Sequence, residues 1–185
     1  MKKRIFQWII DLVAALLPGR RATLSVVRFV GLFNRPMARN HLKHYLSGGG
    51  QSLPVSTARL LKEDMDVRQW FLQAVGEALG NGQVRGAVPV PQSIYAHPDW
   101  RCALGAIQLD WQRDRDGIVV GFEDRYCWKP DEDRVTRGIH RVAEAMKRDG
   151  AREFMMQGLT TRISLRKAIE AATSKPLMKP DRLLL

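Results

Sequence analysis

The chain has 185 residues, 45% of them apolar, and a formal net charge of +11. This length is enough for one domain with its own core and an appendage, and the apolar fraction excludes a disordered chain. Two cysteines, Cys102 and Cys127, are too few for a disulfide-rich scaffold or a cysteine-rich zinc site.

The positive charge is concentrated in the first quarter of the chain. Residues 1–44 contain nine Lys or Arg and one acid, whereas residues 45–185 contain 21 basic and 18 acidic residues. Such a concentration of positive charge attracts anionic lipid headgroups or nucleic-acid phosphates. Because the charges alternate with apolar blocks, we expect an anionic membrane surface or a hydrophobic protein partner, with nucleic acid as the alternative.

The first predicted element is an amphipathic helix over residues 5–17. Its apolar run is too short and too polar to span a bilayer, and Asp11 interrupts it, which favours an interfacial helix over a signal peptide. An ordinary amphipathic helix pair packed on the core is the other interpretation. The residues expected to bind the membrane or the partner are Lys2, Lys3, Arg4, Trp8, Arg20 and Arg21.

Helices continue through the first half of the chain, and strands follow in the second. The pattern predicts further helices at about 22–33, 36–47, 57–63 and 66–80. A proline-containing loop over 81–100 precedes an antiparallel hairpin of segments 103–111 and 118–127, a helix at 134–149, a strand at 152–157 and a helix at 162–173. This order predicts an α+β fold, with a basic helical segment over 1–47, a globular body over 48–175 and a tail over 176–185.

The hairpin has a predicted register. With a turn near Asp114 and Arg115, one face is uniformly apolar, carrying Ile107, Leu109, Trp111, Ile118, Val120 and Phe122. The same register places Asp124 opposite Gly105 and Tyr126 opposite Ala103, both on the buried side. It also places Cys102 opposite Cys127, as a disulfide or as two reduced thiols.

Residues able to perform phosphoryl chemistry follow one another from the end of this hairpin. Asp124 could bind Mg²⁺ or orient water, His140 could act as a general acid or base, and Arg141 could neutralise phosphate charge. Ordinary ion pairs, such as Asp124 with Arg134 and His140 with Glu144, are the structural alternative.

The arrangement of Asp124, Tyr126, His140 and Arg141 resembles the active-site signature of the colicin M-type bacteriocins, which cleave the lipid-linked peptidoglycan precursor lipid II. The resemblance covers about 20 residues, and Cys127 stands where the signature has a second Asp. It implies a toxin- or effector-like hydrolase that cleaves a polyprenyl–pyrophosphate linkage with Mg²⁺, these four residues being catalytic. The expected location is the bacterial cytoplasm or its membrane surface, or outside the cell after export by a specialised secretion route.

Overall fold

The computed structural model describes residues 35–115, 117–126, 146–148 and 150–173. The chain divides into two compact units, which are described separately. Unit 1 comprises residues 1–51 and 125–155, and unit 2 comprises residues 52–124 and 156–185. The division at residue 47 stays a prediction, because residues 1–34 lie outside the described part of the chain.

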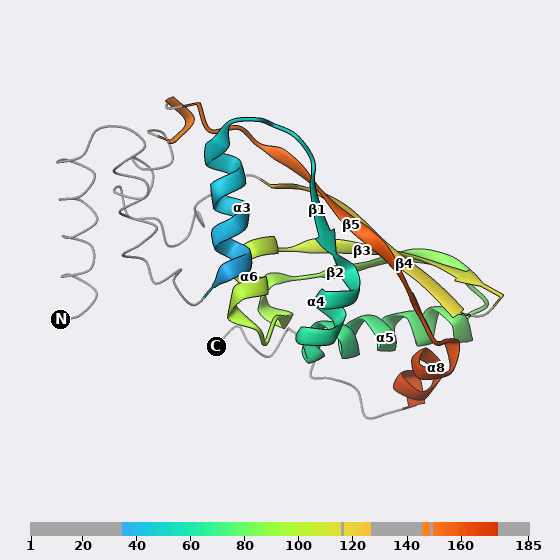
Figure 1. The fold of residues 1–185 in the computed structure, drawn as a ribbon. Coiled ribbons are helices and arrows are strands. Elements are labelled where there is room, and N and C mark those ends of the chain that lie inside the picture. The colour runs from blue at the N-terminus through green and yellow to red at the C-terminus, as the bar shows by residue number, and fades with distance from the viewer. Residues whose placement is uncertain (1–34, 116, 127–145, 149, 174–185) are drawn as a thin grey trace, which may run out of the picture. The chain divides into compact units, whose positions relative to one another are not determined.

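The fold is α+β, as predicted, and is built on a five-stranded mixed sheet (Figure 1). The strand order is β1-β5-β4-β3-β2; β1 is parallel to β5, whereas β2, β3 and β4 are antiparallel neighbours. The strands are β1 (Leu53–Ser56), β2 (Arg85–Val90), β3 (Ile107–Asp114), β4 (Gly117–Tyr126) and β5 (Phe154–Ile163). The helices are α3 (Pro36–Ser47), α4 (Thr57–Glu63), α5 (Met65–Gly80), the 3₁₀ turn η2 (Gln92–Ile94), α6 (Pro98–Leu104) and α8 (Leu165–Thr173).

The helices begin and end where their capping residues predict. Pro36 starts α3, and Gly48 ends it in the left-handed conformation, with φ of 71°. The hydroxyl of Ser56 accepts a hydrogen bond from Arg59 N–H and caps α4, and Asp64 caps α5. The predicted helices at 36–47, 57–63 and 66–80 are thereby confirmed.

The apolar face of the hairpin is confirmed, but its register differs. Trp111 pairs with Val120, and Asp114 pairs with Gly117 across a two-residue turn. The predicted register is therefore wrong by two residues. An even shift keeps the same side chains on the same face, which is why Leu109, Trp111 and Phe122 are still buried.

The hairpin's outer end was predicted wrongly. Residues 103 and 104 end α6, so Asp124 and Tyr126 do not face Gly105 and Ala103 across a ladder. Cys102 is an exposed residue of the same helix and not a strand residue, and Cys127 lies outside the described residues. Pro98 in the first turn of α6 favours a helix there, which the alternating pattern that follows concealed.

Two strands were absent from the sequence prediction. The strands β1 and β2 form the two edges of the sheet and contain Pro54 and Pro89. Proline weakens a strand pattern, yet edge strands tolerate it because one side of them needs no ladder hydrogen bonds. The strand predicted at 152–157 extends to Ile163, so the last helix begins at Leu165 and not at residue 162 as predicted. The helix predicted at 134–149 lies mostly outside the described residues, although 146–148 are helical.

One face of the sheet in unit 2 is covered by helices. The helix α5 packs on β2, α4 and α8 (Figure 1). Side chains on that face are buried, among them Val88, Leu109 and Val120, whereas Ala87, Asp110 and Gln112 on the opposite face are exposed. Among the described residues, no helix is both long and apolar enough to cross a bilayer.

Candidate functional site

The carboxylate of Asp64 fastens the loop between β2 and β3 to the start of α5. The side chain is fully buried, and it accepts a hydrogen bond from Val67 N–H at 3.1 Å as the helix cap. It also accepts from Ala96 N–H at 3.4 Å and from His97 N–H at 2.9 Å. A buried carboxylate needs such donors, so one side chain fixes both the helix start and the loop.

A second contact holds the same loop next to α4. The Trp100 indole N–H donates to Glu63 Oε2 at 3.0 Å, while the Arg59 guanidinium donates to Glu63 Oε1 at 2.7 Å. The Arg59 guanidinium carbon also lies 5.9 Å from the centroid of the Trp100 ring, in cation–π range. The hydrogen bond from Arg59 is the main reason that the pKa of Glu63 lies below its usual value.

These contacts position Tyr95, a residue that the sequence analysis missed. Its side chain is 4% exposed, and its hydroxyl has no hydrogen-bond partner among the described residues. Burial raises the pKa of Tyr95 well above its usual value, and the negative charges of Asp64 and Asp124 raise it further. The phenol therefore stays protonated near neutral pH and can donate a hydrogen bond.

The predicted catalytic Asp124 belongs to this part of unit 2. It is a half-exposed residue near the end of β4, and its charge acts on the buried Tyr95. A ligand can reach the half-exposed carboxylate of Asp124, whereas the Tyr95 hydroxyl is buried. No sequence signal marked Tyr95, because it lies in a proline-flanked loop without periodicity.

The predicted catalytic Tyr126 is an aromatic core residue of unit 1. Its ring stacks on Phe154, with centroids 4.8 Å apart, and forms a T-shaped pair with the His41 ring, with centroids 5.7 Å apart. The ring of Tyr45 lies 5.9 Å away. The expected burial of Tyr126 is confirmed, but its described neighbours are large rings and not the small residues expected to leave a polar pocket beside it.

The other predicted site residues are not among those described. His140 and Arg141, and the N-terminal Lys2, Lys3, Arg4, Trp8, Arg20 and Arg21, all lie in this undescribed part of the chain. The catalytic roles of His140 and Arg141 and the binding role of the N-terminal residues therefore stay predictions. Over the described residues, no group of three or more His, Cys, Asp or Glu side chains could hold a metal ion.

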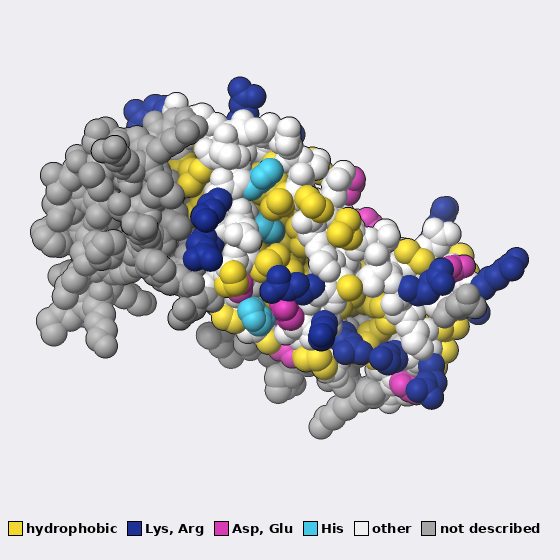
Figure 2. All heavy atoms as spheres, viewed as in Figure 1, with side chains coloured by type: hydrophobic (Ala, Val, Ile, Leu, Met, Phe, Trp, Pro, Cys, Tyr) yellow, Lys and Arg dark blue, Asp and Glu magenta, His cyan; other side chains and the backbone are white. Residues whose placement is uncertain are grey.

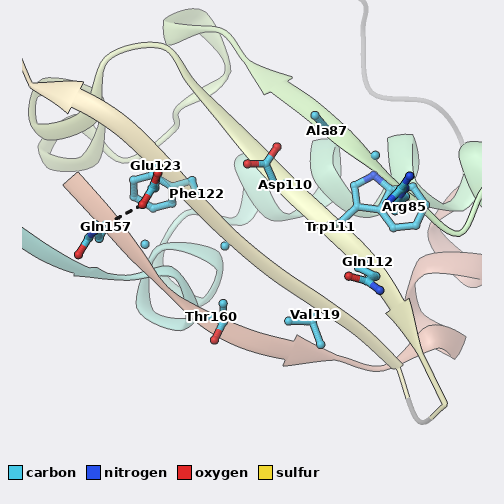
Figure 3. Close-up of a pocket in the computed structure, with 13 residues that line it drawn as sticks. Arg85, Ala87, Asp110, Trp111, Gln112, Val119, Phe122, Glu123, Gln157 and Thr160 are labelled. Carbon is cyan, nitrogen blue, oxygen red and sulfur yellow. Dashed lines mark hydrogen bonds between the residues drawn. The ribbon is translucent and has the colours of Figure 1, made fainter. Parts of the chain in front are cut away.

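A separate groove with both polar and apolar side chains crosses the open face of the sheet in unit 2 (Figure 3). Its volume is about 820 Å³, within the usual range of ligand sites. Gly121 lies within it, and the Gln157 amide donates to Glu123 Oε1 at 3.4 Å on one side. Its other polar side chains come from three strands, namely Arg85, Asp110, Gln112 and Thr160. Of the predicted site residues that the structure describes, neither Asp124 nor Tyr126 lines this groove.

Comparison with known proteins gives no relative for this chain. No family model, no curated protein and no solved structure matches it. Any function must therefore be argued from the residues of this chain.

Proposed function

We propose that the protein is a toxin- or effector-like hydrolase of a membrane-linked phosphate substrate, such as a lipid-linked peptidoglycan precursor. The observation that carries the proposal is the position of Asp124, a half-exposed carboxylate near the end of β4, the strand that leads into the segment containing His140 and Arg141. The resemblance to the colicin M-type signature supplies the reaction.

The other two catalytic candidates follow Asp124 and Tyr126 along the chain. The connection from β4 to β5 runs from Cys127 to Glu153 and carries His140 and Arg141. Its two ends are held together in unit 1, because Tyr126, before it, stacks on Phe154, after it. In this proposal Tyr126 is a positioning residue that anchors the connection.

The reaction would add water across the polyprenyl–pyrophosphate linkage, releasing the polyprenol and a pyrophosphorylated headgroup. Mg²⁺ suits this chemistry, since it is commonly held by one or two carboxylates together with substrate phosphates. A half-exposed Asp124 fits that role, and the metal would neutralise charge on the phosphates. If Asp124 does not bind the metal, it orients the attacking water. His140 exchanges protons with the reacting oxygens, and Arg141 binds phosphate.

The test uses the full chain and a purified polyprenyl-pyrophosphate-linked precursor. Release of the pyrophosphorylated headgroup should fall by at least about a hundredfold in Asp124→Asn and in His140→Ala, as expected when a general acid–base group is lost. Asp110→Asn, an exposed acid on the open face of the sheet, is the matched control and should retain activity. Equal activity in all variants, with unchanged circular dichroism, would refute the proposal.

A non-catalytic function is the second candidate, and the charge of the first quarter favours it. Nine basic residues against one acid, alternating with apolar blocks, suit an anionic membrane surface or a hydrophobic partner. Removing residues 1–20 should then abolish co-sedimentation with anionic vesicles. Unchanged co-sedimentation would exclude this segment as the membrane-binding element.

A further inference from the structure

The charge of unit 2 is divided between the two ends of its sheet. Up to Thr173 this unit contains ten Lys or Arg and eleven Asp or Glu, so it is close to neutral as a whole. Six of the ten cations belong to the end where β3 turns into β4 and β5 leads into α8. We call this set the basic end: Arg85, Arg113, Arg115, Arg162, Arg166 and Lys167.

Strand pairing brings these residues to one end although they are far apart in the chain. Arg85 is opposite Gln112 in the β2–β3 ladder, and the neighbouring Arg113 N–H donates to Val84 O at 2.7 Å. Arg162, near the end of β5, forms an ion pair with Asp114 at the turn. All six members of the basic end are exposed. Figure 2 shows dark blue side chains gathered at the right of the view, where Figure 1 places the β3–β4 turn.

Few acids offset the basic end. Asp114 and Glu170 are ion-paired with Arg162 and Arg166, Glu77 lies in the last turn of α5, and Asp116 follows Arg115 in the sequence. Six cations against four acids leave a net positive charge at this end. The opposite end, around the start of α5 and the last residues of β4 within unit 2, has Glu63, Asp64, Asp66, Asp99, Glu123 and Asp124 against four cations, and is net negative.

Exposed apolar side chains accompany the cations. Val84, which directly precedes Arg85, is 56% exposed. Ile169 is 51% exposed and follows Arg166 by three residues on α8, so the two share one side of that helix. Among the described residues, no Phe, Trp or Tyr is one of the exposed large apolar side chains. Surfaces that bind single-stranded nucleic acid usually present exposed aromatic residues on which bases stack. Cations mixed with exposed aliphatic residues fit the headgroup region of an anionic bilayer.

We propose that the basic end of unit 2 is a membrane-binding surface for anionic phospholipid headgroups, distinct from the basic first quarter of the chain. Arg113 and Arg115 contact lipid phosphates, and Val84 and Ile169 enter the interface between headgroups and acyl chains. This surface orients the body on the bilayer, whether or not the protein is a hydrolase.

The test compares charge-reversal variants of the full chain. Affinity is measured for vesicles of phosphatidylglycerol and phosphatidylcholine in equal amounts, and for vesicles of phosphatidylcholine alone. Arg113→Glu with Arg115→Glu should weaken binding to the anionic vesicles by at least about twentyfold, at about fivefold for each cation removed. Lys62→Glu with Arg101→Glu is the matched control, because both are exposed cations of the opposite end.

The outcomes separate the possible partners. The proposal is supported if the substitutions at Arg113 and Arg115 weaken vesicle binding and those at Lys62 and Arg101 do not. A smaller loss of vesicle binding in Ile169→Ser, which leaves the charge unchanged, also supports it. Equal affinities for both pairs overturn it. A selective loss of binding to a DNA or RNA duplex, with vesicle binding unaffected, also overturns it and assigns the basic end to nucleic acid. Circular dichroism of each variant verifies that the fold is retained.

Discussion

Replacing Asp64 by alanine should destabilise unit 2 far more than the loss of an ordinary helix cap. The substitution removes the cap of α5, which is worth about 1 kcal/mol. It also leaves the N–H groups of Ala96 and His97 without their acceptor, and each such loss in a part-buried site costs roughly 1 kcal/mol or more. The expected decrease in the free energy of unfolding is about 3 kcal/mol.

The measurement is urea unfolding followed by circular dichroism and Trp fluorescence. Ser56→Ala is the matched control, because Ser56 caps α4 with a single hydrogen bond and should cost only about 1 kcal/mol. Asp64→Asn should lie between the two, since asparagine still caps the helix but has one acceptor oxygen in place of two. If Asp64→Ala costs no more than Ser56→Ala, then Asp64 does not fasten the loop, and the positioning of Tyr95 needs another explanation.

Two further predictions concern Tyr95 and Gly158. Because the pKa of Tyr95 is raised in the folded protein, the stability linked to its neutral phenol is complete below the usual tyrosine pKa and is lost as the pH rises above that value. In urea titrations at alkaline pH, Tyr95→Phe should therefore lose less stability than the unaltered protein. Parallel pH profiles for the two proteins would contradict this. A Cβ added to Gly158 would meet the Phe122 ring at less than van der Waals separation, so Gly158→Ala should lower the free energy of unfolding by about 1–3 kcal/mol. Gly80→Ala is the control, because open space surrounds Gly80 and the substitution should cost no stability. Equal unfolding midpoints for the two variants would refute the close approach.

The helices could be predicted because their signals are local. Pro36, Ser56 and Asp64 act on backbone groups within one turn of themselves, and the predicted bounds of α3 and α4 match the structure. The face of the hairpin was also predictable, since side chains alternate strictly along a strand. Its register was not, because a shift by two residues leaves the alternation of Leu109 and Trp111 unchanged.

The candidate site was less predictable, because its contacts are distant in sequence. Asp64 reaches the loop 33 residues later at His97, and Trp100 reaches back 37 residues to Glu63. No periodic pattern encodes such pairs. Tyr95 was missed for this reason, whereas Asp124 is a candidate because it lies near a strand end and in the segment that carries the resemblance. Similarly, the basic end is assembled by strand pairing from segments that each contain only one to three cations.

The prolines of the outer strands have a consequence for self-association. An exposed strand edge offers a row of backbone donors and acceptors on which another molecule can build an intermolecular sheet. Both borders of this sheet carry a residue without an N–H, Pro54 in β1 and Pro89 in β2, and β1 is only four residues long. Edge-to-edge aggregation is thereby discouraged on both sides, so that many copies could crowd onto one surface without forming fibrils.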